Sequence, residues 1–192
     1  MAPASLDKTP PAARPLRAVQ AVELQAQFRR ALEAHDGVAG AHCIHEWWTR
    51  DAFPTHIEAA LAQLWQHAPK SIPDWLPMHY VSWLPLVYEV TARFQATKPG
   101  RRNIYLVRLD YSDRGADLQG IYVGMTAYAP AQRFDQHKSG IRAAGSVLKR
   151  GIEVLTGPTL HLQHIKRGDA ARIEAALASA LADAGIHVEG GH

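Results

Sequence analysis

Arg133 and His137 are the residues of this chain whose types and spacing point most directly to chemistry. They lie four residues apart in a segment that runs from Pro130 to Gly140. Proline suits the first turn of a helix and glycine its end, so we expect a helix with both side chains on one face. A guanidinium offers a planar fork of donors to phosphate oxygens, and histidine titrates near neutrality. Each residue alone is more often an ordinary surface side chain, but the pair favours phosphate chemistry.

Two strand-like runs precede this helix and each of them carries a tyrosine. The first run is Asn103–Leu109 with Tyr105, and the second is Gly120–Thr126 with Tyr122. A turn-rich connection over residues 112–115 joins them, which is typical of an antiparallel pair. A tyrosine in such a strand usually serves packing.

The segments that follow complete the expected domain. Thr159–Gln163 alternates as a third strand would, Asp169 is placed to cap a last helix, and Gly185 is placed to end it. Ile186–Val188 reads as a final short extended segment. The sequence therefore predicts an α+β fold, in which a helical region precedes a domain with a small antiparallel central sheet flanked by helices.

Residues from about 100 to the end resemble the GIY-YIG nucleases, a family named for two short strand motifs. Those motifs read here as Asn103-Ile104-Tyr105 and Tyr122-Val123-Gly124, with Asn103 in place of the first glycine. Arg133 and His137 match the arginine of the family's helix and the histidine that often follows one turn later, and Glu174 matches a glutamate on a later helix. The resemblance implies a GIY-YIG-like nuclease domain over residues 99–192.

The resemblance also implies a reaction and a cofactor. The expected activity is a metal-dependent DNA endonuclease that hydrolyses phosphodiester bonds, in a repair, restriction, mobile-element or toxin setting. Tyr105 would activate or position the water, beside Tyr122, and His137 would share that task. Arg133 would offset charge on the phosphate, and Glu174 would hold Mg²⁺ or Mn²⁺, because such hard cations take oxygen ligands and keep several waters.

A function of another class stays open from the sequence. The same fold could serve as a non-catalytic nucleic-acid-binding or protein-interaction module. A binder of that kind would hold DNA equally well with or without divalent metal and would never shorten it.

The positive charge of the chain is unevenly placed. Residues 1–98 hold nine Lys and Arg against nine Asp and Glu, whereas residues 99–192 hold twelve against nine. A surface that binds DNA phosphates needs such cations, although a solvated basic face explains the charge equally well. The candidates for contacts to the DNA backbone are Lys138, Arg142, Lys149, Arg150, Lys166 and Arg167.

The first half of the chain reads as a disordered lead over residues 1–15 and a helical region over residues 16–98. We expect one helix over residues 16–34 with Gly37 as its stop, and another that begins with the capping box Thr55–Glu58. A further helical run covers Met78–Gln95, with Pro85 as a kink or a break. This region could recognise a target, act as an adaptor, or form a dimer.

All five tryptophans of the chain fall in this region. They anchor a small helical core in the simpler interpretation, and form a surface for a homodimer contact, a protein partner or nucleic-acid bases in the sharper one. His42, Cys43 and His45 are zinc-type ligands, but no second cysteine pair completes such a site, so packing is the better interpretation.

The remaining composition bears on the setting. No apolar run approaches the length that spans a bilayer, and the first residues carry no apolar signal-peptide core, so no membrane partner is expected. The single cysteine, Cys43, excludes an internal disulfide. We therefore expect a reducing, cytoplasmic compartment.

Overall fold

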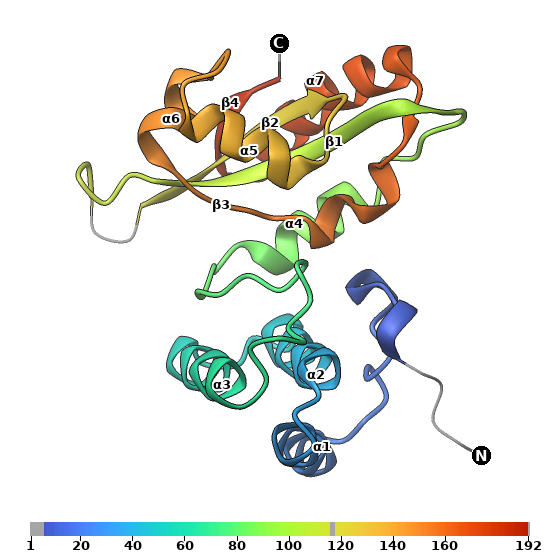
Figure 1. Cartoon of the computed structure of the whole chain (residues 1–192), viewed down its shortest axis with the longest axis vertical. Coiled ribbons are helices and arrows are strands. Elements are labelled where there is room, and N and C mark those ends of the chain that lie inside the picture. The colour runs from blue at the N-terminus through green and yellow to red at the C-terminus, as the bar shows by residue number, and fades with distance from the viewer. Residues whose placement is uncertain (1–5, 116–117, 192) are drawn as a thin grey trace. The chain divides into compact units, whose positions relative to one another are not determined.

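The computed structural model describes residues 6–115 and 118–191 and has an α+β architecture. The chain divides into two compact units, Met1–Pro85 and Leu86–His192 (Figure 1). Helix α4, Leu84–Thr91, contains the boundary. It is shorter than the predicted run Met78–Gln95, and Pro85 lies in its first turn rather than at a kink.

The first unit is built from three helices, α1 (Ala21–Glu33), α2 (Gly37–Thr49) and α3 (Pro54–His67). Two predicted boundaries are wrong. Gly37 begins α2 instead of ending the preceding helix, because the Asp36 side chain accepts a hydrogen bond from the Ala39 N–H and caps the new helix. The predicted capping box at Thr55 does not form, since Pro54 occupies the first helical position and Phe53 is the N-cap.

Residues 6–15, which were expected to belong to a disordered lead, form two 3-10 turns at Leu6–Lys8 and Pro11–Ala13. The Arg14 guanidinium donates to both oxygens of the buried Glu46 carboxylate, at 2.7 and 3.1 Å. The proline- and alanine-rich composition of residues 1–15 gives no indication of this ion pair. Residues 1–5 of the predicted lead lie outside the described residues.

Aromatic rings anchor the core of the first unit. Trp47 and Trp48 are buried, and the Trp48 indole donates to the Val81 carbonyl at 2.9 Å. Trp75 and Trp83 are half-buried, and Trp65 is 58% exposed. The core interpretation is therefore confirmed for the first two tryptophans.

The zinc-type residues of α2 are also buried. Burial raises the pKa of the Cys43 thiol to about 12, so the thiol stays protonated near neutrality. Burial lowers the pKa of His45 to about 4, and it lowers that of His42 against the opposing effect of the Leu6 and Thr9 carbonyls. His42 lies 4.9 Å from Trp75, ring centroid to ring centroid. These residues occupy core positions, as the packing interpretation predicts.

The buried histidines should make the first unit sensitive to acid. A histidine whose pKa falls on folding binds fewer protons in the folded than in the unfolded state between the two pKa values, so the free energy of unfolding falls as pH drops from about 6.5 to 4. His45 alone should contribute a loss of up to about 3 kcal/mol. Tryptophan fluorescence during urea unfolding measures this unit selectively, because all five tryptophans lie within it.

The matched variants are His45→Leu and the exposed His56→Gln. His45→Leu should flatten the dependence of stability on pH over that range, whatever its effect on stability at pH 7, and His56→Gln should leave it unchanged. A His45→Leu protein with the slope of the wild type would contradict the assignment.

The second unit contains a four-stranded sheet in the order β3-β1-β2-β4 (Figure 1). The strands are β1 (Pro99–Asp110), β2 (Gln119–Thr126), β3 (Gly151–Val154) and β4 (His187–Gly190). The predicted antiparallel pair is confirmed, with Asn103 opposite Thr126 and Asp110 opposite Gln119. The sheet is nevertheless mixed rather than purely antiparallel, because β4 joins β2 in parallel.

Helices α5 (Pro130–Lys138), α6 (Gly145–Arg150) and α7 (Arg167–Asp183) flank the sheet. Alternate β1 residues from Tyr105 to Tyr111 pack against α5 and α6, with Val147 of α6 and Phe134 of α5 in the same cluster. The intervening residues of β1, such as Leu106, are also buried and point to the other face, and α7 packs against the sheet as well. Both faces of β1 are thus covered.

Two predictions for this unit are wrong. Thr159–Gln163 is not a strand but belongs to a 3-10 helix, Gly157–Leu162, in which Thr159 is buried and Pro158 sets the first turn. Lys166, and not Asp169, is the N-cap of α7. The Asp169 carboxylate instead accepts a hydrogen bond from the Thr97 hydroxyl at 3.1 Å. Gly185 does end α7, at φ 89°.

Among the described residues, no helix has both the length and the apolar character that crossing a bilayer requires.

Candidate functional site

Two tyrosines form the centre of the candidate site and share one face of the sheet. Tyr105 lies opposite Gly124 in the β1–β2 pairing, and Tyr122 lies opposite Val107, so the tyrosines are diagonal neighbours. Their ring centroids are 5.9 Å apart. A Cβ atom at Gly124 would lie 2.7 Å from Tyr105 Oη and from Tyr122 Cε1. Only a glycine leaves room for both rings over that position.

His137 of α5 holds the Tyr105 hydroxyl. Its Nε2 lies 2.8 Å from Tyr105 Oη, and its Nδ1 accepts a hydrogen bond from the Ala144 N–H at 2.9 Å. Because Nδ1 is an acceptor, the neutral ring carries its proton on Nε2 and donates it to the Tyr105 oxygen. Burial, and then the charge of Arg133, lower the pKa of His137 to about 4, so this neutral form prevails near pH 7.

The two tyrosine rings cluster with this histidine. Burial, and then the charge interaction with Tyr122, raise the pKa of Tyr105, and burial raises that of Tyr122. The Tyr122 ring centroid lies 5.8 Å from that of His137 and 5.9 Å from that of Tyr105. The His137 Nε2–H donates to Tyr105 within this cluster.

Arg133 supplies a fixed positive charge beside these hydroxyls. Its guanidinium donates to the carbonyls of Ile141 and Arg142 at 3.2 and 2.8 Å, which leaves part of its donors for a ligand. Its charge favours the ionised form of both tyrosines. The loop after α5 thus orients the guanidinium before any ligand arrives.

Glu174 approaches the site from α7. The residue is 7% exposed, and its Oε1 accepts a hydrogen bond from the Met125 N–H at 3.0 Å. The pairing of β4 with β2 stops at Val123, so Met125 lies beyond the end of β4. The negative charge of Glu174 raises the pKa of Tyr122. The structure therefore brings all five predicted site residues, from β1, β2, α5 and α7, toward one end of the sheet.

A metal at this site would depend on one carboxylate. In the part of the chain that the structure describes, no three His, Cys, Asp or Glu side chains gather closely enough to hold a metal ion. Glu174 fits a hard cation such as Mg²⁺, which binds through one or two carboxylates and keeps several waters.

The predicted contacts to DNA phosphates fall into two groups. Lys138 Nζ donates to the carbonyls of Leu148 and Gly151 at 3.2 and 3.1 Å, so it ties α5 to α6 and β3. Arg150 donates to the Asp113 carboxylate, with Nη2 and Oδ2 2.9 Å apart. Intramolecular partners therefore occupy these two cations. The other four are exposed: Arg142, Lys149, Lys166 and Arg167.

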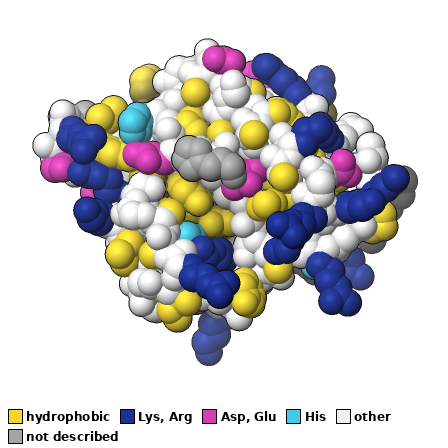
Figure 2. All heavy atoms as spheres, turned by 90° about the horizontal axis from the view of Figure 1, so that it is seen from above, with side chains coloured by type: hydrophobic (Ala, Val, Ile, Leu, Met, Phe, Trp, Pro, Cys, Tyr) yellow, Lys and Arg dark blue, Asp and Glu magenta, His cyan; other side chains and the backbone are white. Residues whose placement is uncertain are grey.

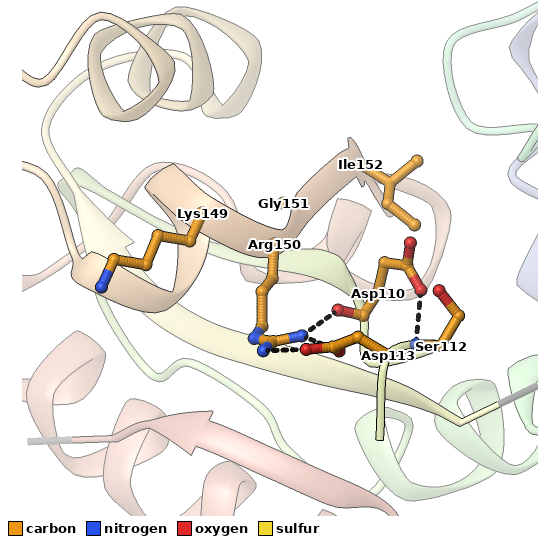
Figure 3. A pocket seen from close by; sticks show the side chains of 7 residues that line it. All are labelled: Asp110, Ser112, Asp113, Lys149, Arg150, Gly151 and Ile152. Atoms are coloured by element: carbon orange, nitrogen blue, oxygen red, sulfur yellow. Dashed lines mark hydrogen bonds and ion pairs between the residues drawn. The ribbon is translucent and has the colours of Figure 1, made fainter. Parts of the chain in front are cut away.

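A cavity of about 410 Å³ lies at the Arg150 ion pair (Figure 3). Asp110, Asp113 and Lys149 are among its lining residues, and Figure 3 shows the Arg150 guanidinium directed at Asp113. None of the five predicted site residues lines this cavity.

Sequence reasoning missed two contributors. The Asn103 side chain donates to the Tyr128 carbonyl at 2.8 Å and accepts from the His164 N–H at 2.9 Å, so it joins β1 to two loops. A polar residue at a buried strand position was the available signal. The Ala144 N–H, which fixes the His137 tautomer, belongs to the backbone and has no sequence signal.

Comparisons with protein-family models, with curated proteins and with solved structures find no match to this chain.

Proposed function

We propose that the second unit is a GIY-YIG-type, metal-dependent DNA endonuclease that hydrolyses phosphodiester bonds. The observation that carries the proposal is the hydrogen bond between His137 and Tyr105, with the Tyr122 ring packed beside both and with Arg133 and Glu174 close by. Tyrosines that served only to pack a strand would not need a histidine, an arginine and a glutamate beside them. The sequence resemblance and the spatial arrangement support the same assignment from different information.

Once its own phenolic proton has been released to solvent, Tyr105 is suited, as a phenolate, to accept a proton from the attacking water. A phenolate on Tyr105 would be stabilised by the His137 Nε2–H and by the charge of Arg133. Burial raises the pKa of this hydroxyl above its usual 10, so proton transfer needs further positive charge from the bound substrate complex. Tyr122, whose ring centroid lies 5.9 Å from that of Tyr105, would pack beside that hydroxyl.

Arg133 is suited to bind the phosphate. Its loop contacts hold it in place, so little conformational entropy is lost when its remaining donors meet phosphate oxygens. A divalent cation held by Glu174 would supply charge stabilisation and activation of water when bound.

A plasmid assay tests the proposal. Supercoiled DNA incubated with the full-length protein should be nicked or linearised in Mg²⁺ or Mn²⁺ and remain intact in EDTA. Intact DNA under every condition, together with a salt-sensitive gel shift that ignores the metal, would favour the non-catalytic binding module instead.

The tautomer of His137 gives a sharper prediction about mechanism. The amide of Gln can donate to Tyr105 as Nε2–H does, but it cannot take a proton. We expect His137→Gln to retain cleavage within about 10-fold of the wild type and His137→Ala to lose about 10²-fold, as for removal of one preorganised donor. Initial rates of plasmid nicking measure both.

Two outcomes would contradict the donor role of His137. Equal loss of cleavage in the Gln and Ala variants would indicate that the imidazole itself accepts the proton. The same conclusion would follow if the wild-type cleavage rate fell on acidification with a midpoint near pH 6.5 and the His137→Gln variant lacked that midpoint. The pKa of about 4 for His137 places its own titration at lower pH.

A further inference from the structure

Two segments of the second unit form a short ribbon at the start of β1. Ile165 bridges to both Pro99 and Arg102, the Gly100 N–H donates to the His164 carbonyl at 2.7 Å, and the Lys166 N–H donates to the Lys98 carbonyl at 3.1 Å. A Cβ at Gly100 would lie 2.3 Å from the Ile165 carbonyl oxygen, so the close approach needs glycine there. The backbone pairing and the glycine that it requires make the ribbon an ordered part of the fold.

The ribbon presents cations and buries its apolar residue. Ile165 is 3% exposed and pins the ribbon to the core. The residues around it carry five positive side chains, of which Arg102 is half-buried and the others are exposed. We call them the basic ribbon: Lys98, Arg101, Arg102, Lys166 and Arg167.

These cations differ from several other arginines of the same unit, which form ion pairs. Arg93 pairs with Glu89, Arg150 with Asp113, and Arg172 with Asp169. Within residues 6–115 and 118–191, the side chains of the basic ribbon form no ion pair with an acidic group. The acidic residue beside them, Asp169, accepts from the Thr97 hydroxyl and pairs with Arg172 instead, which leaves the ribbon cations open to a polyanion. On the face shown in Figure 2, Lys and Arg side chains project around much of the rim.

The basic ribbon continues the strand that carries Tyr105. Arg101 and Tyr105 both lie on β1, about 13 Å apart along the strand. One strand of a duplex carries a phosphate for each 3.4 Å along the helix axis, so over this distance a ribbon parallel to that axis spans about four nucleotides. A backbone that placed one phosphate at Tyr105 would place later phosphates along the ribbon.

We propose that the basic ribbon binds the phosphate backbone of duplex DNA to one side of the scissile bond. The inference rests on the proposed nuclease function for its orientation, but it concerns binding alone. The ribbon carries no exposed large apolar side chain that would insert into a bilayer, which favours a polyanion over a membrane surface. Contacts of this kind position DNA without reading its sequence.

The test compares two triple variants with the same change in net charge. Arg101→Gln/Lys166→Gln/Arg167→Gln removes three exposed cations of the ribbon, and Arg29→Gln/Arg30→Gln/Arg93→Gln removes three exposed cations elsewhere. Fluorescence anisotropy with a labelled duplex in EDTA measures affinity over a range of KCl concentrations without cleavage. Each lost phosphate contact lowers the slope of log K against log[salt] by about 0.9, so the ribbon variant should lose about 2 to 3 in slope and the control variant almost none.

Equal slopes in the two triple variants, or a ribbon variant with the wild-type slope, would overturn the inference, as would a wild-type protein that does not bind the duplex. Thermal melting of both variants establishes that each is folded. The two proposals fail separately. A wild-type protein that binds through the ribbon but never cleaves DNA in Mg²⁺ or Mn²⁺ refutes the nuclease, and one that cleaves with a slope unaffected by the ribbon variant refutes the ribbon.

Discussion

Glu174→Gln should abolish metal-dependent cleavage, by about 10³-fold or more, and leave the second unit folded. Gln keeps the volume of Glu and an Oε1 that can accept from the Met125 N–H, so the contact between α7 and β2 survives. The substitution removes only the negative charge, on which a hard cation depends. Initial rates of plasmid nicking in Mg²⁺, beside thermal melting, separate chemistry from folding.

The matched control for this prediction is Glu189→Gln. Glu189 of β4 also accepts a hydrogen bond, from the Tyr111 hydroxyl at 2.6 Å, and it too is a carboxylate of the second unit. Its conversion to an amide should leave the cleavage rate close to that of the wild type. Cleavage by Glu174→Gln at the rate of Glu189→Gln would remove Glu174 from the metal site.

Gly124→Ala should cost both activity and stability. The new Cβ would lie 2.7 Å from Tyr105 Oη and from Tyr122 Cε1, a separation that real Cβ atoms essentially never show. One or both rings must move, which disrupts the hydrogen bond between Tyr105 and His137. We expect a loss of cleavage of about 10² to 10⁴-fold and a decrease of about 1–3 kcal/mol in the free energy of unfolding, as for overpacking of a core.

Gly168→Ala is the control for Gly124→Ala. Gly168 lies in the first turn of α7, and a Cβ atom added there would meet open space, with no neighbouring side chain within 4 Å. Alanine at this position should be neutral or slightly stabilising, because it favours the helix. If Gly124→Ala retained wild-type cleavage and melting temperature, then the tyrosines would not depend on this glycine.

The sequence was most informative where local periodicity and special residues agree. The antiparallel pair from Asn103 to Thr126 has two apolar runs of strand type, a turn-rich connection and no competing pattern, and it forms as expected. The helix that begins at Pro130 also forms as expected, since proline suits the first turn of a helix. Thr159–Gln163 has strand-like alternation but forms a 3-10 helix, since tertiary contacts such as the Gln163 amide to the Ile104 carbonyl at 2.8 Å outweigh a weak local preference.

Residue types in the sequence were enough to select the candidate site residues, but they predicted only part of the spatial arrangement of those residues. The spacing of Arg133 and His137 places them one turn apart on α5, as the structure has them. The parallel pairing of β4 with β2 has no local signal, and where it stops determines that the Met125 N–H is left for Glu174. Lys138 and Arg150 were chosen by charge alone, and charge does not show that backbone carbonyls and Asp113 already bind them.

Because the β2–β4 pairing ends at Val123, hydrogen exchange of the Met125 amide can report on the state of Glu174. Tyr105 lies on β1, which is covered on both faces and paired on both edges, so its amide should exchange with solvent only when the whole unit unfolds. The Met125 amide depends instead on one side-chain acceptor, the Glu174 carboxylate. A cation that drew this carboxylate away would release the amide, and its hydrogen-exchange rate would rise while that of Tyr105 stayed the same. Metal occupancy could then be followed without any DNA present.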